Sequence, residues 1–121
     1  MIKFSQHAFD RYSERMKKIY GSRIKEYGVV DEGKIRTEIL KKGNFYHDKK
    51  SSNPNDFHCV VNKLTVYTGR INEDGSLYIT TAYPYSKDFQ GLLTRFEKMP
   101  TPAAVQKWRE DLETRLGIKL K

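Results

Sequence analysis

Apolar positions in the first part of the chain recur with the period of an α-helix. Spacings of four, four and three residues give one stripe, made of Ala8, Tyr12, Met16 and Ile19. The stripe predicts a helix over residues 5–20, with Ser5 as its cap and Gly21 after its end. A second helix is expected over residues 31–42, stopped by Gly43, because its apolar residues keep the same period.

From residue 44 the apolar positions alternate instead, which is the period of a β-strand. Stretches rich in β-branched and aromatic residues predict a short strand at 44–47 and an antiparallel meander of three strands at 57–61, 64–70 and 77–83. The polar segment 48–56 is expected to be a loop, and the Asp74-Gly75 pair marks a tight turn before the last strand.

After Pro84 the helical period returns. A short helix is expected around Phe89, Leu92, Leu93 and Phe96. A longer one should have Thr101 as its N-cap and Pro102 in its first turn, and should end at Gly117. The pattern predicts an α+β fold, with N-terminal helices packed on a small antiparallel β-sheet and C-terminal helices. We expect a single domain over residues 1–121, with a core at 5–85 and a C-terminal helical extension at 86–121.

The balance of charge indicates an anionic partner. Lysine and arginine number 23 against 15 aspartate and glutamate residues, which gives a formal net charge of +8. Such a field attracts polyanions, so nucleic acid, RNA in particular, is the expected partner, although an anionic membrane or an acidic protein also fits the charge alone. No apolar stretch resembles a signal peptide or approaches the ~18 residues of a membrane span, so we expect no membrane partner and a cytoplasmic location.

Cysteine and histidine usage predicts neither a disulfide nor a metal site. Cys59 is the only cysteine, and the histidines lack the paired spacing of zinc ligands. Adjacent residues of a strand point to opposite faces, so His58 and Cys59 are expected on different sides of the sheet. Cys59 lies in an apolar run, which predicts an inert core thiol. We therefore expect no metal and no cofactor.

The first helix carries the side chains best suited to a phosphodiester. One side of it, beside the apolar stripe, is formed by His7, Arg11, Glu14, Arg15 and Lys18. An imidazole exchanges a proton near neutral pH, arginine presents a forked donor to phosphate, and the N–H groups of a first helical turn favour an anion. The solvated face of any amphipathic helix shows the same pattern, so both interpretations stay open.

The last predicted strand offers two hydroxyl groups. Alternation places Leu77, Ile79, Thr81 and Tyr83 on one face. If Leu77 and Ile79 face the core, Thr81 and Tyr83 emerge near the strand end, at a cleft beside the first helix. The alternative is that both are ordinary strand residues and that Pro84 only ends the pairing.

A His-Ala-x-x-Arg-x-x-Glu-Arg helix followed by a small sheet that ends in Thr-x-Tyr-Pro resembles the superfamily of small metal-independent ribonucleases. The matching residues are His7, Ala8, Arg11, Glu14 and Arg15, then Thr81, Tyr83 and Pro84. The superfamily includes barnase-like, RelE-like and colicin-type toxins and the ribonuclease A-like toxins of contact-dependent inhibition. The resemblance implies helices packed on a curved antiparallel sheet, an active site in its concave face, and an acidic protein that neutralises the toxin.

The resemblance also implies a mechanism. His7 would act as general base on a ribose 2′-hydroxyl or as acid on the leaving 5′-oxygen. Arg11 and Arg15 would stabilise the charge that grows on the phosphorane, with hydrogen bonds from Thr81 and Tyr83. RNA would be cut through a 2′,3′-cyclic phosphate, and no metal would be required.

Other residues extend the expected nucleic-acid surface. Contacts with the phosphate backbone are expected from Lys18, Lys49, Lys50 and Arg70, although a solvated loop also explains the lysine pair at 49–50. His47 and His58 are open candidates for a second proton carrier. Tyr67 and Tyr78 would stack on unpaired bases if exposed, or pack beneath a C-terminal helix.

Three functions therefore follow from the sequence. The leading hypothesis is a metal-independent endoribonuclease of toxin-like character. The main alternative is a non-catalytic RNA- or DNA-binding regulatory protein, whose affinity would fall steeply with salt. The third is a protein-interaction module that uses an exposed apolar patch on the last helix.

Overall fold

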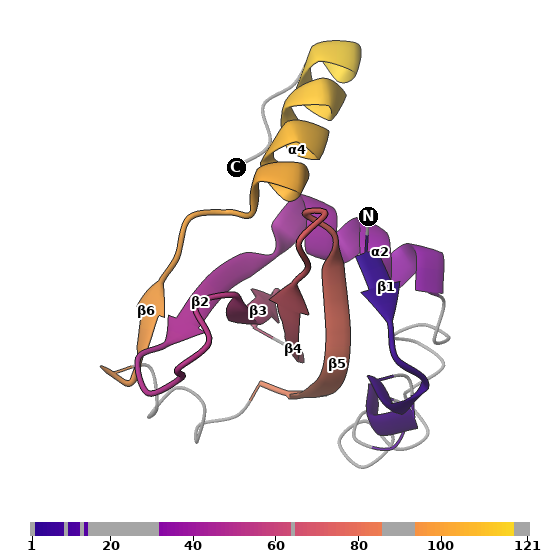
Figure 1. The fold of residues 1–121 in the computed structure, drawn as a ribbon. Helices are drawn as coiled ribbons and strands as arrows, with labels where there is room; N and C mark the ends of the chain where they lie inside the picture. Colours follow the sequence, from indigo (N-terminus) through magenta and orange to yellow (C-terminus); the bar gives the residue numbers. More distant parts are fainter. Residues whose placement is uncertain are drawn as a thin grey trace.

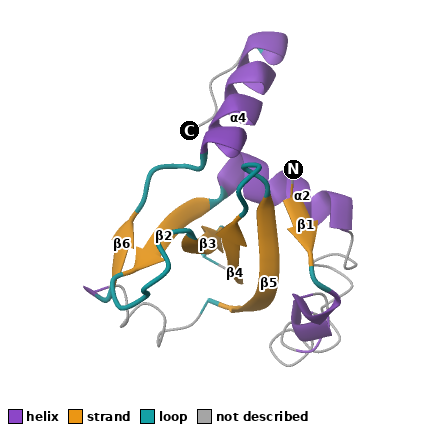
Figure 2. Cartoon of the chain, viewed as in Figure 1, coloured by secondary structure: helices purple, strands orange, loops and turns teal. Residues whose placement is uncertain are grey.

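The computed structural model describes residues 2–8, 10–12, 14, 32–63, 65–85 and 94–117. They form a mixed α+β fold around one six-stranded sheet (Figure 1). The strands are β1 (Ile2–Phe4), β2 (Asn44–Asp48), β3 (Asp56–Val61), β4 (Thr65–Ile71), β5 (Leu77–Pro84) and β6 (Phe96–Lys98), and the longest described helices are α2 (Glu32–Lys42) and α4 (Ala103–Leu116). Figure 2 shows α2 and α4 meeting at one end of the sheet.

The centre of the sheet is the predicted meander. Strands β2, β3, β4 and β5 are antiparallel neighbours, and the order across the whole sheet is β1-β5-β4-β3-β2-β6. The predicted strands and the helix that became α2 are therefore confirmed. The two edge strands were not predicted: β1 pairs with β5 in parallel, and β6 pairs with β2 in antiparallel fashion.

Phe96 corrects one of the helix predictions. It was expected in a short helix, but it begins β6, where it pairs with Asp48 and packs against Val60 and Val66. Sheet pairing satisfies its backbone, and the apolar contact buries its ring to 8% exposure. Residues 86–93, the rest of that predicted helix, lie outside the described part of the chain.

The N-terminal helix is capped as its sequence predicts. Ser5 Oγ accepts a hydrogen bond from the backbone N–H of Ala8 at 3.0 Å and donates one to the carbonyl of Thr80 at 3.1 Å. Residues 6–8, 10–12 and 14 are helical. The later positions of the expected stripe, Met16 and Ile19, and the expected end at Gly21 lie outside the described residues. The cap therefore ties the start of this helix to β5.

One face of the sheet, which we call the core face, carries the main hydrophobic core. Its side chains are at most 5% exposed: Phe45, Phe57, Cys59, Val61, Tyr67, Leu77, Ile79 and Ala82. Helix α2 adds Ile35, Ile39 and Leu40, and α4 adds Val105. The N-terminal helix joins the same core through Ala8 and Tyr12, and the Tyr12 ring stacks on Tyr67 with centroids 6.2 Å apart. The N-terminal helix and α2 thus pack on the core face, whereas α4 contacts α2 and reaches the core through Val105 near its start.

The opposite face, which we call the open face, is only partly covered. Half-exposed or exposed side chains occupy it: Tyr46, His58, Thr68, Arg70, Tyr78, Thr80, Thr81 and Tyr83. A small apolar cluster of Val60, Val66 and Phe96 lies among them. Within the described ranges, no helix packs on this face.

A β-bulge in β5 corrects the predicted alternation. Thr68 pairs with Thr81, but the next residue, Gly69, pairs with Ile79, so Thr80 is an extra residue in β5. The extra residue reverses the alternation beyond it. Ala82 consequently joins Ile79 on the core face, while Thr81 and Tyr83 point to the open face. The prediction that Leu77, Ile79, Thr81 and Tyr83 share one face is wrong.

Helix α4 begins one residue later than predicted. Pro102 is its N-cap, with φ −52° and ψ 140°, and its carbonyl accepts the first helical hydrogen bond, from Gln106 N at 2.9 Å. Thr101 is therefore not the cap. The predicted end at Gly117 is confirmed, because this glycine adopts the left-handed conformation (φ 67°) and its N–H bonds to the Glu113 carbonyl.

Candidate functional site

The structure does not bring the predicted catalytic residues into one cleft. His7 and Arg11 are exposed on the N-terminal helix, where Arg11 Nε lies 3.4 Å from His7 Nε2 and Nη1 forms an ion pair with Glu14 at 3.2 Å. That helix packs on the core face, whereas Thr81 and Tyr83 belong to the open face. Arg15 and Lys18 lie outside the described residues. The physical reason for the separation is the bulge at Thr80.

His58 is the histidine that the structure places among other functional groups. A cavity of about 210 Å³ is lined by Asp56, Phe57, His58, Thr68, Gly69, Arg70 and Thr80. Two hydroxyl groups meet there, since Thr68 Oγ1 and Thr80 Oγ1 are 3.4 Å apart. Beside the carboxylate of Asp56, the cavity thus combines an imidazole, a guanidinium and two hydroxyl groups. These are the groups that the sequence analysis sought beside His7.

The imidazole of His58 is held between aromatic rings. Its centroid lies 4.5 Å from that of Phe96 and 6.4 Å from that of Tyr83, which meets it edge to face. Burial lowers the pKa of His58 below its ordinary value, and the nearby Asp48 carboxylate opposes this effect only in part. The neutral imidazole, which can accept a proton, is therefore favoured near neutral pH.

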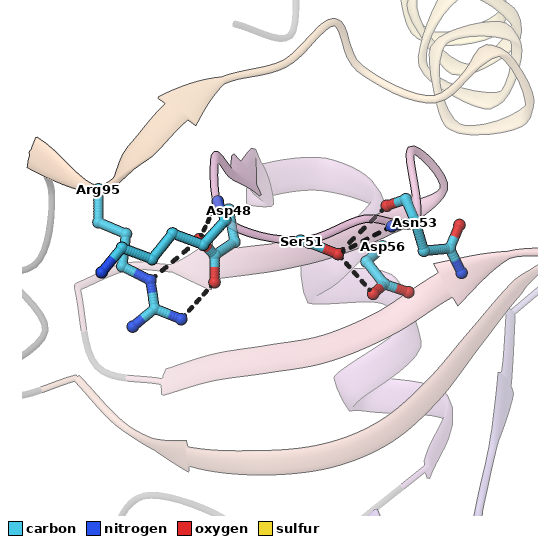
Figure 3. Close-up of polar contacts among 6 residues, drawn as sticks. Asp48, Ser51, Asn53, Asp56 and Arg95 are labelled. Carbon is cyan, nitrogen blue, oxygen red and sulfur yellow. Dashed lines mark hydrogen bonds and ion pairs between the residues drawn. The ribbon is translucent and has the colours of Figure 1, made fainter.

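An ion pair borders the same region (Figure 3). Arg95 donates from Nε to Asp48 Oδ1 at 2.9 Å and from Nη2 to Oδ2. The hydrogen bonds from Arg95 and from the backbone N–H of Lys50 hold the pKa of Asp48 well below its usual range, and Asp48 raises the pKa of Arg95. This forked pair joins β2 to the segment before β6, so it fixes the outer edge of the open face.

The loop between β2 and β3 is ordered by its own polar side chains. Ser51 Oγ donates to Asp56 Oδ2 at 3.0 Å and accepts from Asn53 N at 3.2 Å (Figure 3). His47 Nδ1 donates to the Asp56 carbonyl at 2.9 Å. His47 therefore supports this loop, which makes it a poorer candidate for proton transfer than His58.

A larger cavity lies at the other end of the open face. It has a volume of about 520 Å³ and is lined by Lys42, Asn44, Tyr46, Val60, Asn62, Lys63 and Tyr85. Tyr46 and Tyr85 pack their rings against the apolar cluster of Val60, Val66 and Phe96. The cavity thus offers two half-exposed rings, two carboxamides and two ammonium groups.

The predicted phosphate contacts have different surroundings. Arg70 lies on the open face, with its guanidinium carbon 5.0 Å from the centroid of the Tyr78 ring. Lys49 donates from Nζ to the Thr94 carbonyl at 3.3 Å, and Lys50 is exposed in the loop after β2. Arg70 also lines the cavity that contains His58.

The two tyrosines that were considered for base stacking lie on opposite faces. Tyr67 is 5% exposed on the core face, where burial raises the pKa of its hydroxyl. Tyr78 is half-exposed on the open face beside Arg70. Cys59 is confirmed as a buried core thiol on the face opposite His58, and burial raises its pKa strongly.

Sequence reasoning missed several open-face residues. Asp48 and Arg95 were not singled out, because 47 residues separate them along the chain. No function was assigned to Tyr46 or Tyr85 from the sequence. Alternation through the predicted strand at 44–47 and through 57–61 could have placed Tyr46 and His58 on one face, since these two residues pair directly in the sheet.

The described residues offer neither a metal-binding cluster nor a membrane-spanning helix. They contain no group of three or more His, Cys, Asp or Glu residues placed to hold a metal ion. Among them, no helix is long and apolar enough to span a membrane.

Comparisons of the chain with protein-family models, with curated proteins and with solved structures find no match.

Proposed function

We propose that this chain binds single-stranded RNA along the open face of its sheet. One observation carries the proposal: aromatic rings and cationic side chains share a half-exposed sheet surface that no described helix covers. Unpaired bases stack on aromatic rings, and lysine and arginine neutralise the phosphates between them.

The aromatic rings of this surface pack on buried apolar side chains. Tyr46, Tyr83 and Tyr85 pack against the apolar cluster, so their rings are held in place by contacts other than a ligand. Preordered rings lose little conformational entropy when a base stacks on them. Tyr78 adds a fourth ring near the opposite edge of the meander.

The cationic part lies around these rings. Exposed basic side chains on or beside the open face are Lys42, Lys63, Arg70, Arg95 and Lys98. Two acidic residues lie in the same region: Asp48 is paired with Arg95, and Asp56, beside Arg70, accepts a hydrogen bond from Ser51. Together with the net charge of +8, this arrangement favours a polyanion over a neutral ligand.

Binding of a labelled oligoribonucleotide tests the proposal. We expect fluorescence anisotropy to show binding that weakens with salt, with a log–log slope of about −0.7 for each phosphate contact. Tyr78→Ala and Arg70→Gln should each weaken binding about tenfold, since stacking on one ring is worth ~1–3 kcal/mol. The same RNA in a duplex should bind more weakly because its bases are already stacked.

Lys34→Ala is the matched control, because Lys34 is an exposed cation on α2 that, unlike Lys42 at the end of the same helix, lines neither of the two open-face cavities. It should change the affinity by less than about twofold. Equal losses for Lys34→Ala and Arg70→Gln would show that charge alone attracts the RNA and would contradict an interface on the open face. Absence of RNA binding at low salt would contradict the function itself.

A second candidate function is RNA cleavage at the His58 cavity. The observation that favours it is the convergence of His58, Arg70, Thr68 and Thr80 on one small space. The neutral imidazole would take the proton of a ribose 2′-hydroxyl, and the 2′-oxygen would bond to phosphorus. The bond to the 5′-oxygen would then break, and the imidazolium would return the proton to that oxygen. Arg70 and the two threonines would stabilise the added charge on the phosphate.

Incubation of end-labelled RNA with the purified protein in EDTA tests this second function. We expect products with 2′,3′-cyclic phosphate ends and a loss of about a hundredfold in rate for His58→Gln. Because the pKa of His58 is lowered, the rate should fall only at pH values below the ordinary histidine pKa of about 6.5. RNA left intact by the wild-type protein would contradict cleavage, and loss of activity in His7→Ala alone would return the role to the N-terminal helix.

A further inference from the structure

The larger cavity of the open face has a composition that fits a nucleobase rather than the phosphate backbone alone. Its volume is about 520 Å³, and the carboxamides of Asn44 and Asn62 line it together with the rings of Tyr46 and Tyr85. Aromatic rings bind the flat faces of a base, whereas carboxamides recognise its polar edge. Lys42 and Lys63 complete the lining with two positive charges.

The carboxamides are partly oriented by the protein itself. Asn62 Nδ2 donates to Glu38 Oε2 at 3.2 Å, and Asn44 Nδ2 lies 3.4 Å from the Lys42 carbonyl. Each bond uses one of the two N–H groups of the amide, so each side chain keeps Oδ1 as an acceptor and one N–H as a donor for a ligand. An acceptor beside a donor matches the N6 amino group and the N7 nitrogen of adenine.

Asn62 is also fixed by the backbone of the hairpin between β3 and β4. Asn62 and Lys63 both have φ of 54°, in the left-handed region that asparagine adopts more readily than most residues. Both residues of this turn line the same cavity. A ribonucleotide could place its base against Asn62 and its phosphate near Lys63.

We propose that this cavity is a base-recognition subsite that prefers adenine over uracil in single-stranded RNA. Adenine carries the N6 amino donor that the Asn oxygens accept, and its two fused rings offer more area than a pyrimidine to Tyr46 and Tyr85. Uracil presents a carbonyl oxygen where adenine presents the amino group and has a single ring, so it offers neither the N6 donor nor the same stacking area. The subsite rests on the proposed RNA binding and assigns part of its specificity.

A pair of oligomers that differ in one base tests the subsite. The ligands are a fluorescein-labelled oligouridine and the same strand with one central adenosine, measured by anisotropy at the same salt. We expect the adenosine strand to bind about five- to tenfold more tightly, in the range of one good base contact. Asn44→Ala and Asn62→Gly should remove this preference and leave the affinity for oligouridine within about twofold. Glycine is chosen at position 62 because it adopts a positive φ without strain.

Lys63→Gly is the matched control in the same turn, since it removes a charge and keeps the backbone conformation available. It should weaken both oligomers equally and leave the adenosine preference intact. Equal affinity of the wild-type protein for the two strands, or a preference that survives in Asn44→Ala and Asn62→Gly, would overturn the subsite while RNA binding stands. Failure of both strands to bind would instead overturn the proposed function on which the subsite depends.

Discussion

Replacing Gly69 by alanine is expected to destabilise the fold by about 3 kcal/mol. A Cβ atom at this position would lie 2.2 Å from the Tyr78 carbonyl oxygen and 3.0 Å from Cζ of Phe57. The first contact is with the backbone of the neighbouring strand, which cannot move away without breaking the sheet. Overpacking of this kind typically costs ~1–3 kcal/mol, and a backbone clash belongs at the upper end of that range. Urea unfolding followed by circular dichroism measures the change.

Gly75→Ala provides the comparison for this prediction. Gly75 has φ of 85°, but no atom lies within 4 Å of the position of its Cβ. Alanine there should therefore cost only the left-handed backbone penalty of ~1–2 kcal/mol. If the two variants unfold at the same urea concentration, the close approach of β4 and β5 at Gly69 does not constrain the fold as we infer.

Gly69 also matters for the open face. It pairs with Ile79 directly beside the bulge, and it lines the cavity that contains His58. The glycine allows the two strands to approach where Thr80 is inserted, and this insertion turns Thr81 and Tyr83 away from the core. RNA binding by folded Gly69→Ala should consequently be weakened, whereas Gly75→Ala should bind like the wild type.

The bulge marks the limit of what alternation alone can predict. The period-two pattern correctly located the central strands and correctly placed His58 and Cys59 on opposite faces. The alternation could not show that Thr80 is an extra residue. Leu77 and Ile79 before the bulge and Ala82 after it are all residues that a continuous strand would also contain. Because the bulge was not predicted, Thr81 and Tyr83 were expected on the core face, whereas they lie on the open face.

The edge strands β1 and β6 and the ion pair between Asp48 and Arg95 could not be predicted, for a different reason. Strands β1 and β6 each have only three residues, too few for a period to be recognised. Their pairing depends on contacts between distant parts of the chain, such as Ile2 with Leu77 and Phe96 with Asp48. The surroundings of His58 likewise come from β3, β4 and β5 together, so no local sequence motif predicts them.

Replacing Arg109 is the second change with a large expected effect on stability. This arginine is 8% exposed, and burial lowers the pKa of its guanidinium. It donates from Nε to the Leu40 carbonyl, near the end of α2, and from Nη2 to the Gly43 carbonyl at 2.9 Å. Carbonyls at a helix end have no partner within the helix. A side chain of α4 therefore completes the C-terminus of α2.

We expect Arg109→Met to lower the free energy of unfolding by about 2–4 kcal/mol. Methionine fills much of the same space but leaves two buried carbonyls without a donor, at a cost of ~1–3 kcal/mol each when solvent cannot replace it. Arg109→Lys should recover only part of the loss, because one ammonium group cannot reproduce the two-pronged geometry. Guanidinium chloride unfolding of the wild type, Arg109→Lys and Arg109→Met measures the order of their stabilities.

Arg115→Met is the matched control on the same helix, since Arg115 is exposed in the last turn. It should change stability by less than about 0.5 kcal/mol. Both variants should bind RNA normally at temperatures where they are folded, because the contacts of α4 are with α2 and the main core, away from the open face. A stability loss in Arg109→Met no larger than in Arg115→Met would mean that water can reach the two carbonyls and that the packing of α4 on α2 does not depend on this arginine.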